Sequence, residues 1–266
     1  MVLTSARRPA HQRGDELVVA VPDFDVPTVT RASLAFQTTF GADTGFFSDW
    51  NLQLDYIYSK FNNSLNFVDL SQTPDIRNGL NGFTVDGRPI LAAIDNVANA
   101  DCDAVLQGNG GTPPVYTGVS ASCFNTRRDD NIQLTNGRDG ESHSVSATIS
   151  KQFDAGLFTQ GGSTRVQFGY AFTDSNNARN NQSSTATSSF DVTAAFDRQD
   201  PAISTATTET RHNFTAAVNF REQFIDGYDT SFGFFFRARA GRPYSLTFDG
   251  GGVFADSSSG TDNALL

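Results

Sequence analysis

The chain has 266 residues, and its 19 Lys and Arg against 29 Asp and Glu give a formal net charge of −10. This charge excludes a protein that holds nucleic-acid phosphates with a basic face, so we expect no nucleic-acid partner. It also excludes a polybasic membrane-surface anchor. No apolar run approaches the roughly 18 residues of a membrane-spanning helix, although Phe alone supplies 24 residues.

The first residues lack a secretory signal. Such a signal has a basic start, an apolar stretch of about 7–15 residues and a small-residue cleavage site, whereas residues 1–15 carry the charges without the apolar stretch. The sequence therefore predicts either a protein that stays inside the cell or an incomplete precursor. Residues 1–28 form a segment of unclear structure, and residues 29–266 form one predicted unit. The polar stretch 250–266 closes no element, which favours truncation.

Apolar and polar residues alternate with a period of two in six stretches, and helical periodicity is absent. The stretches are residues 30–40, 50–58, 144–153, 165–173, 211–224 and 230–240. In the last of them, the apolar series of Phe232, Phe234, Phe236, Ala238 and Ala240 is set against Gly233, Arg237 and Arg239. We therefore predict six strands, each with one apolar and one polar face.

The apolar phase changes after residue 58, where Phe61, Leu65 and Phe67 take over at odd positions. An extra residue in one strand would produce such a change. The sequence therefore predicts a β-bulge near Lys60.

The connections between the strands alternate in length. Residues 41–49, 154–163 and 225–229 are short connections, whereas residues 71–130, 175–210 and the stretch from 245 onward are long ones. Outer-membrane barrels have short periplasmic turns and long external loops, with aromatic residues near the strand ends. A soluble β-sandwich has no reason to keep its long loops at one end. The pattern predicts an all-β fold: an antiparallel up-and-down transmembrane β-barrel, represented here by an incomplete segment of about six strands with long external loops.

No motif for catalysis, a cofactor or a metal is present. The sequence has no GxSxG, Walker or dinucleotide-binding motif, and its three His residues are scattered. Asp129, Asp130 and the stretch 249–262 offer oxygen ligands for calcium, but no EF-hand spacing, so solvated loops are favoured. We expect a protein that is not an enzyme and has no catalytic residues, metal or cofactor.

Two cysteines, Cys102 and Cys123, lie in one long polar segment. Without a CxxC pair or clustered His they do not make a zinc site. They form either a disulfide that closes a loop, which requires an oxidising compartment, or two unrelated thiols.

Four arginines fall on the polar side of the predicted strands, opposite the Phe rows. They are Arg165, Arg221, Arg237 and Arg239. Because a charge that meets lipid is costly, these side chains are predicted to face the lumen. They either line it or contact a plug or a passing anionic ligand; the first interpretation is favoured.

Two regions resemble a known family once the strands are placed. Residues 27–40 and 50–70 resemble a paired-strand region of the TonB-dependent receptors of the Oar-like (OmpA-related) group. Residues 212–248 resemble a later strand–turn–strand of that group, in which an aromatic-rich strand ends in a Gly-Arg-Pro-Tyr-Ser segment. The matching residues are Gly241, Arg242, Pro243, Tyr244 and Ser245.

The resemblance implies an outer-membrane barrel of about 22 strands with a plugged lumen. Such a receptor takes up large, scarce nutrients, so the implied partners are outer-membrane lipid, a plug domain, the TonB energy-coupling complex and an unidentified ligand. Residues 71–130 and 175–210 would face outward and capture the ligand. Six strands are fewer than the roughly 8 of the smallest closed barrel, which makes this chain an expected barrel fragment.

Two other functions remain open from sequence alone. A secreted or surface adhesin with a β-sandwich or β-solenoid fold would bury the Phe rows in a core. An outer-membrane enzyme would need a clustered catalytic set.

Overall fold

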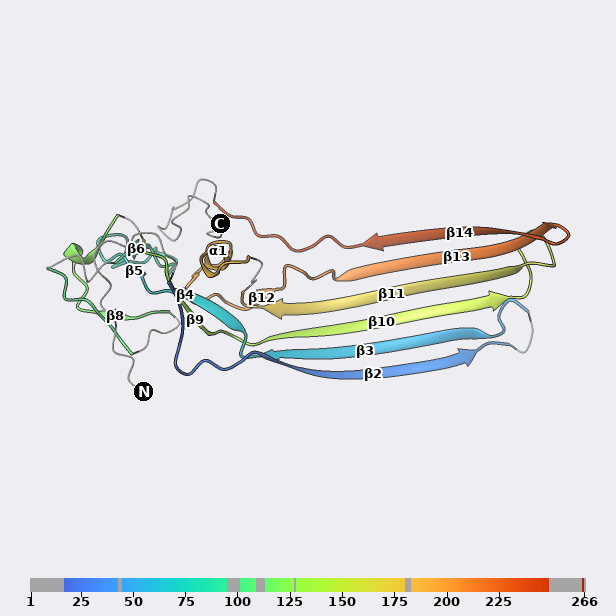
Figure 1. The fold of residues 1–266 in the computed structure, drawn as a ribbon, viewed down its shortest axis with the longest axis horizontal. Helices are drawn as coiled ribbons and strands as arrows, with labels where there is room; N and C mark the ends of the chain where they lie inside the picture. The colour runs from blue at the N-terminus through green and yellow to red at the C-terminus, as the bar shows by residue number, and fades with distance from the viewer. Residues whose placement is uncertain are drawn as a thin grey trace.

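The computed structural model describes residues 17–42, 45–94, 101–108, 113–126, 128–179, 183–248 and 265. Its main element is a sheet of six long antiparallel strands that lie side by side in chain order (Figure 1). The strands are β2 (Thr28–Phe40), β3 (Trp50–Asn62), β10 (Gly140–Phe153), β11 (Ser163–Asn177), β13 (His212–Ile225) and β14 (Tyr228–Arg239). The all-β prediction and all six predicted strands are confirmed.

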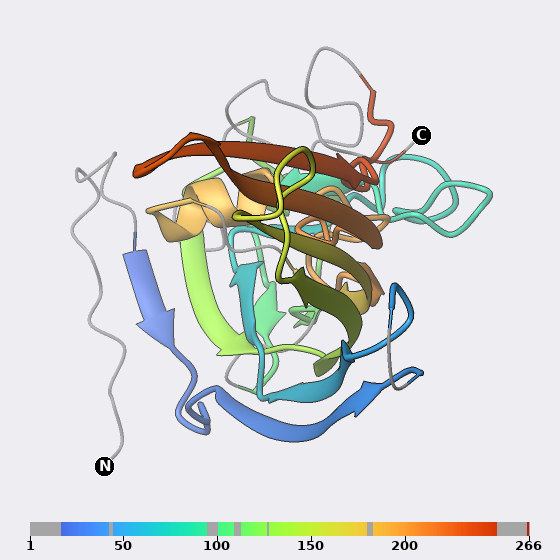
Figure 2. The same cartoon turned by 90° about the vertical axis from the view of Figure 1, so that its right-hand side faces the viewer.

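The sheet is curved but open (Figure 2). Within the described residues, β2 pairs only with β3 at one edge, and β14 pairs only with β13 at the other. A short strand, β12 (Ser204–Thr205), adds to one end of β11. The described part of the chain is therefore an antiparallel meander and not a closed barrel.

The strand register sorts the side chains onto two faces, because residues paired across a sheet point to the same side. Thus Val218 pairs with both Val166 and Phe234, and the alternation continues through all six strands. We call one side the apolar face. Its members are Ala32, Leu34, Phe36, Phe40, Trp50, Leu52, Leu54, Tyr56, Tyr58, Val145, Ala147, Ile149, Phe153, Val166, Phe168, Tyr170, Phe172, Phe214, Ala216, Val218, Phe220, Phe232, Phe234, Phe236 and Ala238.

The opposite side, which we call the polar face, carries mainly hydroxyl, amide and guanidinium groups. It includes Arg31, Gln37, Thr39, Asn51, Gln53, Asp55, Ser59, Ser142, Ser144, Ser146, Thr148, Ser150, Arg165, Gln167, Thr173, Asn213, Thr215, Asn219, Arg221, Arg237 and Arg239. The large apolar exceptions on this side include Val29, Ile57, Phe61 and Phe235. The six strands thus separate apolar from polar side chains across one layer.

The predicted bulge near Lys60 is wrong. The β2–β3 register runs without a break from Thr28↔Asn62 to Phe40↔Trp50. The phase changes because β3 ends at Asn62 and a new strand begins at Leu65, after Asn63 has turned the chain with a φ of 54°. A register shift does occur in the sheet, but between β13 and β14 beyond Glu222.

The long connections fold into a compact body at one end of the sheet, which we call the head (residues 63–139 and 178–211 with β1; Figure 1). Its elements are β1 (Leu17–Ala20), β4 (Leu65–Asp69), β5 (Gln72–Pro74), β6 (Leu91–Ala93), β7 (Val105–Leu106), β8 (Tyr116–Thr117), η1 (Ala121–Cys123), β9 (Asn131–Asn136) and α1 (Ala186–Asp191). Strand β1 pairs in parallel with β9, which also pairs with β4. The short turns lie at the other end of the sheet.

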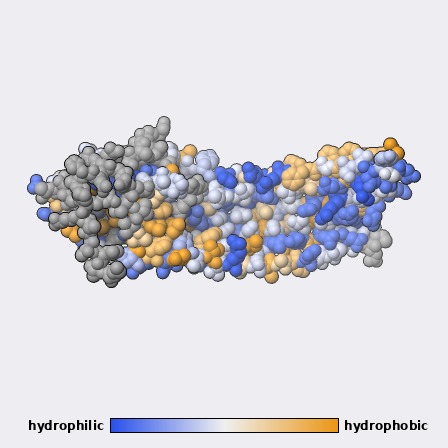
Figure 3. All heavy atoms as spheres, viewed as in Figure 1, coloured by the Kyte–Doolittle hydropathy of each residue, from blue (hydrophilic) through white to orange (hydrophobic). Residues whose placement is uncertain are grey.

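Most buried apolar residues lie in the head, and Trp50 and Phe220 are the buried ones among the described residues of the long strands. Val68, Cys123, Ile132 and Phe190 are fully buried. Hydrophobic side chains of the sheet half instead reach the surface, as Figure 3 shows. No helix in the described part of the chain is long and apolar enough to cross a membrane.

Candidate functional site

The apolar face is the largest functional candidate, because most of its large side chains are exposed and, within the described structure, only Trp50 and Phe220 beside the turns are buried. Leu34 is 71% exposed, Phe234 64% and Phe236 57%. At about 200 Å² per ring, the exposed Phe side chains alone contribute roughly 700 Å². Soluble monomers rarely expose a contiguous apolar patch larger than a few hundred Å², and larger patches mark protein or membrane contacts.

Amphipathic rings border the apolar face toward the head. The Tyr56 hydroxyl hydrogen-bonds to Nδ1 of His143 at 2.9 Å, and the Tyr170 hydroxyl hydrogen-bonds to Nδ1 of His212 at 2.8 Å. Each pair combines an apolar ring body with a polar tip. Such side chains are enriched where hydrocarbon meets water.

A second border lies toward the short turns. Trp50 Nε1 donates to the carbonyl oxygen of Phe46 at 2.9 Å, and the Phe46 ring stacks on Phe153 with centroids 5.6 Å apart. On β10, His143 and Lys151 mark the two borders, and at about 3.3 Å per residue they lie roughly 26 Å apart. Outer-membrane barrels show an apolar band about 25 Å tall, measured across the bilayer. A strand tilted by about 40° would cover nearer 20 Å of it.

Two charged side chains on this side of the sheet are drawn into the turns. Lys151 Nζ donates to the carbonyl oxygens of Gly45 (2.8 Å) and Phe46 (3.0 Å) and to both oxygens of Ser48. Lys151 is buried. Because its charge is hydrogen-bonded to four oxygens, Lys151 holds the 41–49 turn without placing a free charge on the apolar face.

Glu222 does the same for the next turn. Its carboxylate accepts hydrogen bonds from the backbone N–H groups of Leu157, Phe158 (3.1 Å) and Thr159 (2.9 Å), and from the Thr159 hydroxyl (2.7 Å). Glu222 is fully buried. Neither role could be predicted from the alternation of apolar and polar residues. Near the end of its strand, each of these charged residues occupies a position where the alternation calls for an apolar side chain.

The four predicted arginines all lie on the polar face and are exposed. They form two pairs at opposite ends rather than one cluster. Toward the turns, Arg165 lies on β11 and Arg221 on β13, where Arg221 contacts Asp229 at 3.5 Å. Toward the head, Arg237 and Arg239 lie on β14, and Arg237 donates to the Asn213 side-chain oxygen at 2.9 Å. Their lumen-facing role remains a prediction.

The segment that carries the family-like motif follows β14. Gly241, Arg242, Pro243, Tyr244 and Ser245 form no strand, and the Tyr244 side chain is 85% exposed. None of them contacts the four polar-face arginines in the described structure. The motif therefore builds no site by itself.

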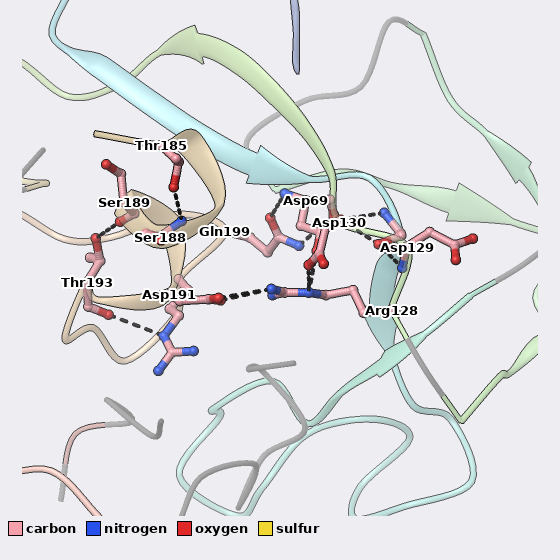
Figure 4. Close-up of polar contacts among 12 residues, drawn as sticks. Asp69, Arg128, Asp129, Asp130, Thr185, Ser188, Ser189, Asp191, Thr193 and Gln199 are labelled. Atoms are coloured by element: carbon pink, nitrogen blue, oxygen red, sulfur yellow. Dashed lines mark hydrogen bonds and ion pairs between the residues drawn. The ribbon is translucent and has the colours of Figure 1, made fainter. Parts of the chain in front are cut away.

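Inside the head, a buried ionic cluster joins the two long connections (Figure 4). Arg128 Nε contacts Asp69 (3.0 Å) and Asp130 (2.6 Å), and Arg128 Nη2 contacts Asp191 (2.9 Å). The Gln199 amide accepts from the Asp69 backbone N–H at 2.8 Å and donates to the Asp69 carbonyl oxygen at 2.9 Å. Residues of segments 71–130 and 175–210, predicted as separate loops, therefore form one body.

The remaining predicted candidates are the two cysteines and the acidic residues considered for calcium binding. Cys102 and Cys123 are joined in a disulfide that packs with Ile94 and Ala104. Asp130 contacts Arg128. The stretch 249–262 lies outside the described residues, and within them no group of three or more His, Cys, Asp or Glu could hold a metal ion.

A cavity of about 310 Å³ lies where the polar face meets the head. Phe61 of β3 and Asn177 of β11 line it from the sheet. Asn66 of β4, Arg138 and Asp200 line it from the head. The sequence contained no signal for it, because its walls come from segments more than a hundred residues apart.

Comparison with protein-family models, with curated proteins and with solved structures yields no match.

Proposed function

We propose that this chain forms part of the wall of an outer-membrane β-barrel, with its apolar face toward lipid and its polar face toward a water-filled lumen. The observation that carries the proposal is the uncovered apolar face, bordered at both ends by amphipathic rings. Transmembrane barrels combine this outward band with aromatic girdles and a polar interior. Lys151 and Glu222 fit the same account, because both charges are hydrogen-bonded within the turns.

The proposed orientation follows from the two ends of the sheet. Short turns face the periplasm in such barrels and long loops face outward, so the head would lie on the cell surface. The Cys102–Cys123 disulfide in the head supports this orientation, because disulfides persist in oxidising compartments.

The open edges of the sheet call for additional strands. An unpaired edge exposes backbone N–H and C=O groups, and hydrocarbon does not tolerate unsatisfied backbone groups. Strands β2 and β14 would therefore pair with further strands of the complete barrel. Six long strands alone are fewer than the roughly 8 of the smallest closed barrel.

The specific function that we propose is that of a TonB-dependent receptor of the Oar-like group, which captures a scarce nutrient and passes it through a gated lumen. The resemblance of residues 27–40, 50–70 and 212–248 supports the family. The head provides a folded outer body for ligand capture, and the polar-face arginines would face a plug. Partners would be lipid, the plug, the energy-coupling complex and the ligand.

An adhesin with a β-sandwich fold is the alternative from another class. It requires a second layer over the Phe rows, and the exposure of Leu34, Phe234 and Phe236 favours the barrel.

Solubility tests the proposal. The chain, expressed with an export signal, is expected to be insoluble in buffer alone and extractable only with detergent, because its apolar face and both edges of its sheet are open. Purification from the soluble fraction with a cooperative thermal transition in buffer alone would contradict the barrel and favour the adhesin.

A further inference from the structure

The cavity between the polar face and the head has an apolar patch in its floor. Val29 and Phe61 are paired across β2 and β3, and Phe61 is in turn paired with Gly140 of β10. Gly140 lies against Asn177, since a Cβ on Gly140 would stand 3.4 Å from the Asn177 Cα and 2.6 Å from the Asn176 carbonyl oxygen. The absence of a side chain at Gly140 therefore lets β10 approach the Asn176–Asn177 backbone of β11 closely, next to Phe61 in the cavity floor.

The charged groups of the lining are already partnered within the protein. Arg138 Nη2 donates to Asp200 at 2.7 Å, which cancels one charge against another. The buried Arg179 donates from its nitrogens to the Asn66 side-chain oxygen (2.7 Å), to Thr193 Oγ1 (3.0 Å) and to the carbonyl oxygens of Ser189 and Arg198. Burial, together with nearby Arg198, lowers the pKa of Arg179 to about 9. Arg138 is thus paired with a carboxylate, whereas Arg179 is hydrogen-bonded to neutral oxygens only, with its nitrogens directed to protein acceptors.

Uncharged polar groups, by contrast, are available. Among the described residues, the side chains of Ser64, Asn177 and Thr208 line the cavity and hydrogen-bond to no protein group. The Asn amide offers both donor and acceptor positions, and each hydroxyl offers one donor and two acceptor lone pairs. The volume of about 310 Å³ lies at the lower end of the range for small-molecule sites, about 300–1,000 Å³.

From this lining we propose that the cavity binds a neutral polyhydroxylated ligand, namely one or two sugar units of a glycan. A pyranose presents hydroxyl groups around its rim and C–H groups on its faces, which match the free amide and hydroxyls and the Phe61–Val29 patch, respectively. An anionic ligand is disfavoured because Arg138 is paired with Asp200, the nitrogens of Arg179 already donate to protein oxygens, and the chain carries a net charge of −10. The inference deepens the proposed receptor function by naming the substrate class of the outer body.

The test uses the whole chain purified in a zwitterionic, sugar-free detergent, because alkyl-glycoside detergents would compete for the site. Saturation-transfer NMR and calorimetric titration are run with glucose, cellobiose and chitobiose, with citrate as an anionic probe and spermidine as a cationic probe. We expect at least one of the sugars to bind saturably and the two charged probes not to compete.

The variant Asn177→Leu is expected to weaken sugar binding by roughly tenfold, because it removes a donor–acceptor group from the floor. The matched control Asn219→Leu makes the same change on the polar face near the turns, outside this cavity, and is expected to leave binding unchanged. If Asn177→Leu fails to fold, Thr208→Ala, in the head, is expected to weaken binding in its place.

Three results would overturn the inference: no saturable binding of any of the three sugars, binding of citrate that competes with the sugar, or sugar binding indifferent to both Asn177→Leu and Thr208→Ala. These results differ from failure of the receptor proposal. A chain that purifies without detergent would refute the membrane location while leaving the sugar titration interpretable.

Discussion

A charge introduced on one face of β13, compared with the same charge on the other face, tests which face meets lipid and which meets water. Ala216 and Ala217 are adjacent, of equal size and equally half-buried, but the register puts Ala216 on the apolar face and Ala217 on the polar face. Ala216 lies four residues from His212 and six from Glu222, about 13 Å and 20 Å along the strand. It therefore sits near the middle of the apolar band.

The expected magnitudes follow from that position. An arginine at the bilayer midplane of a barrel wall costs about 2–4 kcal/mol, so Ala216→Arg should lower the equilibrium constant for folding in lipid by about 30- to 1,000-fold. Ala217→Arg should change it by no more than about 0.5 kcal/mol, as is usual for exposed substitutions.

The assay is a urea titration of the chain in phosphatidylcholine vesicles, followed by the fluorescence of Trp50, the one Trp of the chain. Far-UV circular dichroism of both variants controls for loss of β-structure. Equal destabilisation by the two substitutions, or a larger effect of Ala217→Arg, would refute the assignment of the faces.

Three further predictions concern the turns and the head. Lys151→Met should lower the free energy of opening the 41–49 turn by about 2–3 kcal/mol, because four hydrogen bonds to a charge are lost. Amide hydrogen exchange of the turn measures this change. The exposed Lys60, replaced in Lys60→Met, provides the control. The disulfide between Cys102 and Cys123 closes a loop with a sequence separation of 21. Reducing it should lower the stability of the head by about 3 kcal/mol. The expected readout is faster proteolysis between the two cysteines. Burial, followed by nearby Asp69, raises the pKa of Tyr116 to about 12. The absorbance change that accompanies ionisation of this hydroxyl should therefore occur at about that pH, and it should be absent in Tyr116→Phe.

The sign for Tyr116 follows from linkage. The unfolded hydroxyl ionises near pH 10 while the folded one stays neutral to about 12, so head stability should fall as pH rises from 10 to 12. A pH-independent stability over that range would contradict the burial of this hydroxyl. Unchanged exchange in Lys151→Met, or proteolysis indifferent to reduction, would contradict the roles given to those groups.

The strands could be predicted because alternation with a period of two is a local property of the sequence. Each run such as Phe232–Phe234–Phe236 carries its own signal, and the strand register then aligns neighbouring runs. The phase change after residue 58 was misinterpreted, since the end of one strand and the start of another produce the same pattern as a bulge.

The head could not be predicted, because its stability comes from contacts between distant segments. Arg128 contacts Asp191, 63 residues away, and Gln199 binds the Asp69 backbone across 130 residues. The cavity escaped prediction for the same reason. Lys151 and Glu222 could have been noticed as charges in apolar phase near strand ends, but the turns that bind them are not encoded by any local motif.

In the proposed barrel wall, the apolar face of the sheet meets lipid while the polar face meets water. Single cysteines introduced one at a time at residues 214–219 of β13, each carrying a nitroxide label, measure this most directly in vesicles. Because the two native cysteines are joined in a disulfide, the label reacts only with the introduced cysteine. We expect accessibility to dissolved oxygen to peak at even positions and accessibility to a water-soluble nickel chelate to peak at odd positions. Low accessibility to both reagents at the even positions, as in the core of a soluble sandwich, would contradict it.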